Sequence, residues 1–166
     1  MKHQGLLVAV VGMLALGIAS PASAVPGVTT ATITVPTAAG NLGTAVNTVS
    51  GEAIAGPLGV VQVNDARSAA AGSGWVASVI ASAFTPPAGP AIAASAVSYT
   101  AGTITKVGTA TYTANDPGNL TGVAPAVTAT GITGDNSATW NPTINVAVPG
   151  GMAAGVYSAT VTHSVV

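Results

Sequence analysis

The chain has 166 residues, of which 4% are charged and 49% are hydrophobic, and its formal net charge at pH 7 is -1. Its three Lys and Arg residues are too few to neutralise a run of phosphates, which excludes a nucleic-acid-binding protein. The absence of cysteine excludes disulfides and cysteine-based metal or redox sites. Glycine (21) and proline (11) stay below the level typical of low-complexity disorder, so we expect a packed domain.

The first 24 residues are typical of a secretory signal peptide. A basic start at Lys2 precedes an uncharged apolar run, 5–19, and small residues end the segment at Ala24. The run is shorter than the roughly 20 residues that a membrane span needs. We expect cleavage after Ala24 and a secreted protein with no lipid and no transmembrane anchor, so that retention at the cell surface depends on binding.

The sequence after Ala24 has the composition of β-strands. It is rich in Val and Thr and poor in Leu, and β-branched side chains fit a pleated sheet better than a helix. Clusters of Gly, Pro, Asn and Asp separate the short apolar runs. The nine expected strands are 28–35, 44–49, 58–64, 75–84, 91–100, 103–113, 126–132, 138–148 and 156–165. They predict an all-β protein, a single antiparallel β-sandwich of the Ig-like or jelly-roll-like kind.

The signal peptide at 1–24 precedes an N-terminal strand or arm region, 25–57, and the main sandwich region, 58–166. We expect the last two to form one domain. Long helices are not expected, and only 65–71 is a candidate for a helical turn, which the following glycines would end.

Two runs near the end of the chain have the period of a half-buried strand. In 156–165 we expect the odd positions to face inward, and Gly155 before Tyr157 is typical of a tyrosine corner. In 138–148 the proline removes one ladder donor, which indicates an edge or a bulge. The apolar face of that run consists of Trp140, Pro142, Ile144, Val146 and Val148.

The run 75–84 has no clearly polar face, which indicates a central strand covered on both sides or a bulge that switches its face. We expect the two tryptophans, Trp75 and Trp140, to be anchors of the core because they are the largest apolar groups of the chain.

Few residues of the mature chain suit catalysis or metal binding. His163 shares a strand face with Val and Ala, so we interpret it as a packed or rim histidine rather than a member of a catalytic triad. No pair of acids has a spacing that suggests a glycosidase, and we expect neither a zinc nor a calcium site and no cofactor. Asp116 and Asp135 are interpreted as parts of Asx-type turns. We therefore expect no enzyme, and a secreted hydrolase is kept as a formal alternative.

Asp65 and Arg67 stand two positions apart and share a face if the chain is extended. One interpretation is an ion pair that orients the end of a strand. The other is a contact with a glycan, in which the two charged groups bind hydroxyls and an exposed edge of Trp75 stacks on a sugar ring.

Five segments of the chain resemble the WxL-type cell-surface domain, in the form found in secreted actinobacterial proteins. They are 63–67 (VNDAR), 74–79 (GWVASV), 92–99 (IAASAVSY), 139–144 (TWNPTI) and 154–165 (AGVYSATVTHSV). The resemblance covers roughly residues 58–166. Ala77 stands where the first motif of the family has Leu, and 159–163 lacks the Trp of the second motif. The resemblance implies a β-rich, non-catalytic domain that associates non-covalently with the Gram-positive cell wall through peptidoglycan or another wall glycan.

The expected location is therefore extracellular and associated with the cell wall, with other surface proteins or a second copy as further partners. A self-assembling structural or adhesin-type subunit is the alternative, because 155–162 also looks like the last strand of pilin and spore-coat-type sandwiches, which pair edge strands. The candidate ligand-binding residues are Asp65, Arg67, Trp75, Trp140, Tyr157 and His163.

Overall fold

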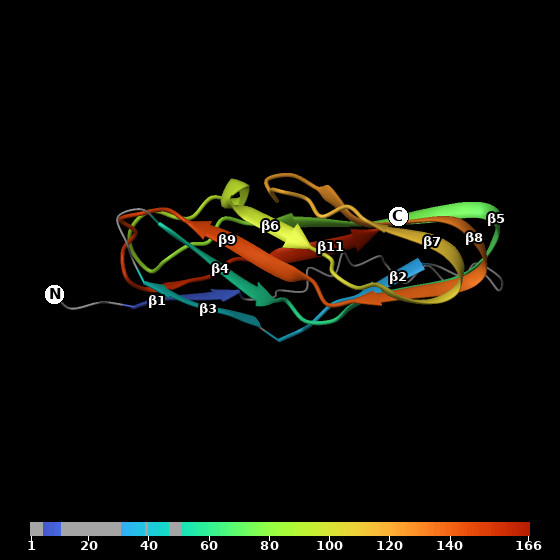
Figure 1. Cartoon of the computed structure of the whole chain (residues 1–166), viewed down its shortest axis with the longest axis horizontal. Coiled ribbons are helices and arrows are strands. Elements are labelled where there is room, and N and C mark those ends of the chain that lie inside the picture. The colour runs from blue at the N-terminus through green and yellow to red at the C-terminus, as the bar shows by residue number, and fades with distance from the viewer. Residues whose placement is uncertain (1–4, 11–30, 39, 47–50) are drawn as a thin grey trace, which may run out of the picture.

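The computed structural model describes residues 5–10, 31–38, 40–46 and 51–166, and these residues form strands with no α-helix among them (Figure 1). The strands are β1 (Gly5–Val10), β2 (Ala31–Thr34), β3 (Gly40–Val46), β4 (Glu52–Pro57), β5 (Val61–Ala81), β6 (Val97–Thr100), β7 (Thr105–Ala114), β8 (Ala124–Trp140), β9 (Thr143–Val148), β10 (Val156–Tyr157) and β11 (Val161–Val165). One 3-10 turn, η1 (Ala94–Ala96), precedes β6. The all-β prediction is confirmed. No helix in the described part of the chain is long and apolar enough to cross a membrane.

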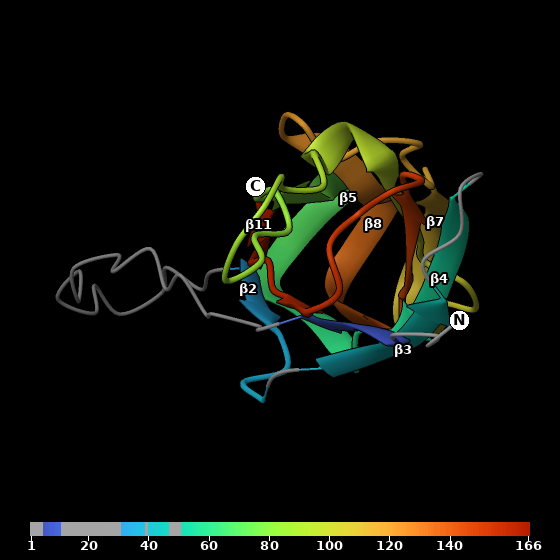
Figure 2. The same cartoon turned by 90° about the vertical axis from the view of Figure 1, so that its left-hand side faces the viewer.

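The strands form three sheets that pack against one another. The largest has the order β11-β5-β8-β7, and β2 also pairs with β5; the other two have the orders β4-β9-β6 and β10-β1-β3. Every strand pair is antiparallel except β1 with β10. Viewed along the long axis of the molecule, the strands surround a common interior, as a sandwich of antiparallel sheets requires (Figure 2). The largest fully buried side chains are Trp140, Tyr99, Tyr157, Phe84, Ile92, Leu120, Ile132, Ile144 and Val61.

Strands β5 and β8 are the longest, and both bend in the middle. Their ladder shifts register three times between Asp65 and Trp75, which is the mark of β-bulges. Ser68 lies in this stretch with a φ of 49°. Figure 1 shows β5, β7 and β8 curving together over one end of the molecule. The ladder therefore folds over, so that its two halves face each other.

The helical turn expected at 65–71 is wrong, because this stretch lies inside β5. The alanines there favour a helix locally, but the segment pairs with β8 through Ala69 and Gly134. Cross-strand pairing thus overrides a weak helix propensity.

The apolar face predicted in 138–148 is confirmed, since its five members are all buried. The prediction that 138–148 forms one strand is wrong, because β8 ends at Trp140 and β9 begins at Thr143, in a different sheet. Pro142 lies in the break, where its missing N–H costs no ladder bond. The chain thus passes from one sheet to the next while its apolar face continues inward.

The inward odd face of 156–165 is also confirmed, although the run is divided into β10 and β11. Tyr157 and His163 are buried, and Val165 packs against the core. The Tyr157 hydroxyl donates to the carbonyl of Ala153 at 3.0 Å, four residues upstream, as a tyrosine corner does.

The second half of β5, from Trp75, is a central strand between β11 and β8, as expected for the run 75–84. Its odd positions are buried and its even positions are half-buried up to Ile80. The face changes only after the strand ends at Ala81, and Phe84 is again buried.

Two described strands, β1 and β4, lie where no strand was predicted. β4 pairs with β9 and β2 pairs with β5, so both are built into the sheets of the later strands. Parts of two expected strands, 28–30 and 47–49, lie outside the described residues, as does the expected cleavage site at Ala24. Strand β1 lies within the expected signal peptide and pairs with β3 and β10 in this uncleaved chain.

Candidate functional site

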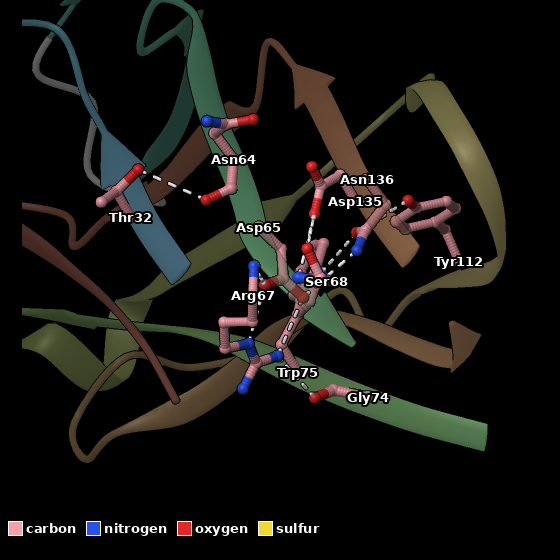
Figure 3. A network of polar contacts seen from close by, with 10 residues as sticks. All are labelled: Thr32, Asn64, Asp65, Arg67, Ser68, Gly74, Trp75, Tyr112, Asp135 and Asn136. Atoms are coloured by element: carbon pink, nitrogen blue, oxygen red, sulfur yellow. Dashed lines mark hydrogen bonds and ion pairs between the residues drawn. The ribbon is translucent and has the colours of Figure 1, made fainter. Parts of the chain in front are cut away.

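Five of the six candidate ligand-binding residues belong to two clusters of hydrogen-bonded side chains, and Tyr157 lies apart from both. The first, called here the bend cluster, consists of Asp65, Arg67, Trp75, Tyr112 and Asn136 (Figure 3). Arg67 donates to both carboxylate oxygens of Asp65, from Nε at 2.7 Å and from Nη2 at 2.9 Å. Asp65 is fully buried, and the hydrogen bonds from Arg67 hold the pKa of its carboxyl below the usual value. The ion pair expected for these two residues is confirmed, but it lies within β5 rather than at the end of a strand.

The side chain of Asn136, on β8, connects the other members of the bend cluster. Its side-chain amide donates to Asp65 Oδ2 at 3.2 Å. Its Oδ1 accepts the indole N–H of Trp75 at 2.9 Å and the hydroxyl of Tyr112 at 3.2 Å. The Trp75 and Tyr112 rings also meet, with their centroids 5.7 Å apart. One amide therefore connects three strands, β5, β7 and β8.

Further hydrogen bonds that involve residues outside the bend cluster hold the bend closed. Arg67 Nη2 donates to the carbonyl of Gly74 at 3.1 Å, across the bulged stretch of β5. Asp135 Oδ1 accepts the backbone N–H of Ser68 at 2.9 Å, the residue with the left-handed backbone. Asp135 therefore lies in β8 and accepts a hydrogen bond from β5, and the Asx-type turn expected for it is wrong.

The second cluster, called here the histidine cluster, consists of Tyr99 on β6, Trp140 at the end of β8 and His163 on β11. The indole N–H of Trp140 donates to the Tyr99 hydroxyl at 2.7 Å, and this hydroxyl lies 3.1 Å from His163 Nε2. Because the Tyr99 oxygen already accepts from Trp140, its own proton is free to be donated to a neutral His163. Burial lowers the pKa of His163 to about 4 and raises that of Tyr99. The cluster is therefore uncharged at neutral pH and joins all three of its strands.

This geometry favours a structural role for His163. Its hydrogen-bond partner is a neutral hydroxyl, whereas a catalytic triad needs a carboxylate on the far ring nitrogen. In the described ranges, no group of three His, Asp or Glu side chains is placed to hold a metal ion.

Five of the six candidate ligand-binding residues lie inside the protein. Asp65, Trp75, Trp140, Tyr157 and His163 are buried, and the side chain of Arg67 alone is 34% exposed. The exposed edge expected for Trp75 is wrong, because this residue is 2% exposed and its N–H is already bonded to Asn136. The roles of both tryptophans as core anchors are confirmed.

Sequence reasoning missed Tyr99, Tyr112 and Asn136, which complete the two clusters. One feature of the sequence pointed to such partners: a buried tryptophan needs a hydrogen-bond acceptor for its indole N–H, and this applies to both Trp75 and Trp140. That rule demands a partner but does not say which of the chain's hydroxyls and amides supplies it.

One of the strand edges at the ends of the described sheets is that of β7. This strand ends the largest sheet and pairs only with β8 among the described strands. Thr111, Thr113 and Ala114 are exposed, and pairing in this part is regular, from Thr111 with Thr130 to Ala114 with Val127. We call Thr111–Ala114 the β7 edge.

No protein-family model matches this chain, and no curated protein matches it. The likeness to the WxL-type domain therefore rests on the five sequence segments alone.

Proposed function

We propose that the chain is a secreted, non-catalytic cell-surface protein that associates non-covalently with the Gram-positive cell wall, through peptidoglycan or another wall glycan. The observation that carries this proposal is the internal bonding of the groups best suited to acid–base chemistry. Asp65 is paired with Arg67, and His163 is held neutral against Tyr99. These groups stabilise the fold, which favours action by surface contact. The signal-like start supports export, and the WxL resemblance supports the wall as the partner.

Arg67 is the best contact group for the wall among the six candidates. Within the described residues its side-chain bonds use Nε and Nη2, which leaves Nη1 for an outside acceptor. Peptidoglycan carries carboxylates on its peptides and hydroxyls on its sugars, and a guanidinium donates to both. Asp65 and Gly74 hold the guanidinium in place, so little side-chain entropy is lost on binding.

Retention of the purified protein by insoluble peptidoglycan tests this proposal. Arg67→Lys keeps a cation beside Asp65 but loses the planar fork. Lys106→Gln removes the exposed cation that lies 5.9 Å from the centroid of the Tyr112 ring and controls for the loss of a positive charge. Near-UV circular dichroism confirms that each variant is folded. We expect saturable retention of the wild type and of Lys106→Gln, and several-fold weaker retention of Arg67→Lys. A folded wild type that stays in the supernatant would refute wall association, and full retention of Arg67→Lys would refute the role of Arg67.

A structural subunit that pairs edge strands is a second candidate, and the open edge of β7 favours it. An exposed strand edge presents unpaired N–H and C=O groups that another strand can use. Structural subunits that pair edge strands act by assembling with other subunits, and this assembly requires no ligand pocket.

A further inference from the structure

We propose that the chain forms a symmetric dimer through the β7 edge, in which β7 of a second copy runs antiparallel with Tyr112 opposite Tyr112. The proposal deepens the second candidate function by naming the strand, the register and the partner. It does not depend on wall binding, because Arg67 lies on β5 and stays outside the paired edge.

The backbone of the β7 edge has the right groups free. The N–H of Asn115 donates to the carbonyl of Ala126 at 3.0 Å, which sets the alternation of the β7–β8 ladder. In an antiparallel ladder every second residue bonds the neighbouring strand. Thr113 and Thr111 therefore bond β8, whereas Tyr112 and Ala114 direct their N–H and C=O groups away from it. These outward groups are those that a symmetric pair centred on Tyr112 uses.

The first half of β7 is protected against such pairing. The register shifts between Val107 and Thr109 and again between Thr109 and Thr111, so the edge there is bulged. Lys106 is cross-strand from the buried Ala138, which places a charge on the inner face at the sheet edge. Bulges and inward charges are two of the devices that block edge pairing. The unprotected part is therefore the short stretch around Tyr112.

The proposed register matches side chains of the two copies. With Tyr112 opposite Tyr112, Thr111 of each copy faces Thr113 of the other, and such Thr–Thr pairs stabilise a sheet. Ala110 then lies opposite Ala114, which adds no bulk. The uncharged, hydroxyl-bearing edge is thus complementary to itself, which favours a second copy over a partner of different chemistry.

Charge favours the antiparallel arrangement. Lys106 and Asp116 stand on either side of Tyr112 along the chain, Lys106 within β7 and Asp116 in the turn after it. Antiparallel pairing brings the Lys106 end of one copy toward the Asp116 end of the other and keeps the two lysines about 40 Å apart. A parallel, in-register pair would place like charges side by side. Since the paired stretch is short, we expect a weak, concentration-dependent dimer.

Charge complementation between two variants tests the proposal by analytical ultracentrifugation. The double variant Thr111→Lys/Thr113→Lys places lysines opposite lysines, and Thr111→Glu/Thr113→Glu places glutamates opposite glutamates. Both changes are on exposed side chains, so the fold should be unaffected. Thr143→Lys, an exposed threonine on the central strand β9, is the matched control.

We expect the wild type and Thr143→Lys to dimerise, each double variant alone to dimerise at least tenfold more weakly, and an equimolar mixture of the two to recover the dimer. A wild type that remains monomeric at every concentration would overturn the proposal. A dimer that survives the lysine pair, or a mixture that stays monomeric, would overturn it as well. Retention by peptidoglycan is measured separately, so failure of the dimer and failure of wall association are distinct results.

Discussion

The indole N–H of Trp75 donates to Oδ1 of Asn136 at 2.9 Å, although the two residues are 61 positions apart in the chain. Trp75 lies beyond the bulged stretch of β5, and Asn136 pairs with Asp65 before it. The bond therefore joins the two halves of the folded ladder. Because Asn136 also bonds Asp65 and Tyr112, one amide connects the ion pair, the tryptophan and the edge strand.

Replacing Asn136 with alanine should destabilise the protein. The change leaves the buried N–H of Trp75 without its acceptor and Asp65 without one donor, which costs about 1–3 kcal/mol for an unsatisfied buried group. Urea unfolding measures the loss. Asn145→Ala removes an exposed amide on β9 and serves as the control, with an expected change within about 0.5 kcal/mol. Equal stabilities of the two variants would contradict a structural role for the bend cluster.

The stability of the protein should fall on acidification from pH 6.5 to pH 4. Burial lowers the pKa of His163 from 6.5 to about 4, so the unfolded chain takes up the proton first as the pH falls. The contribution of neutral His163 to the free energy of unfolding is fully present above pH 6.5 and is lost between pH 6.5 and pH 4. This loss amounts to about 3 kcal/mol. The pKa of Asp65 is lowered from 3.8, so its own contribution is lost only below that window.

Unfolding free energies measured across this pH range check the assignment, with His163→Phe as the variant that removes the titration. We expect the variant to have a flatter pH profile between 6.5 and 4 than the wild type. If both proteins lose the same stability over the window, His163 is not the group responsible.

Gly74→Ala should be strongly destabilising, because a Cβ at this position would lie 2.6 Å from the backbone oxygen of Ala129. The facing atom belongs to the β5–β8 ladder and has little freedom to shift, so we expect a loss of about 2 kcal/mol or more. Gly118→Ala is the matched control, since a Cβ there meets no atom within 4 Å. Thermal unfolding compares the two, and a tolerated Gly74→Ala would show that the bend adapts more readily than its packing indicates.

Export should remove the first 24 residues and leave Val25 as the N-terminus. The prediction follows from the basic start, the apolar run and the small residues at Ala24. Intact-mass and N-terminal analysis of protein recovered from the culture medium of an expressing strain checks it. Recovery of the uncleaved chain with the cells would contradict it and would keep strand β1 in its place beside β3 and β10.

Alternation along the chain was enough to predict much of the fold. The apolar faces of 138–148 and 156–165 are buried as expected, because period-two alternation fixes which side chains can face the core. The same alternation did not show that each run is divided between sheets, since a chain that crosses at Pro142 keeps its inward face. The missed strand β4 has the residues EAIAGP, whose pattern is too short and too rich in small residues to be distinctive.

The candidate site was harder to predict, because the role of each of its residues depends on whether the side chain is buried. Asp65 and Arg67 were recognised as a pair from their spacing, and the pair is present. Sequence could not show that Asn136 lies beside them, because that contact depends on the register that pairs Asp65 with Asn136 in the β5–β8 ladder. The bond from Trp75 to Asn136 requires, in addition, the fold of the ladder at its bulges. The same fold turns Trp75 from a candidate for sugar stacking into a residue of the core.

The most direct test of this account measures stability and wall retention together for Trp75→Phe. This change keeps a large aromatic ring in the core but removes the N–H that bonds Asn136. We predict that the variant unfolds at lower urea than the wild type and, while folded, is retained by insoluble peptidoglycan to the same extent. Unchanged stability with lost retention would contradict the account, because it would make Trp75 part of the binding surface rather than part of the fold.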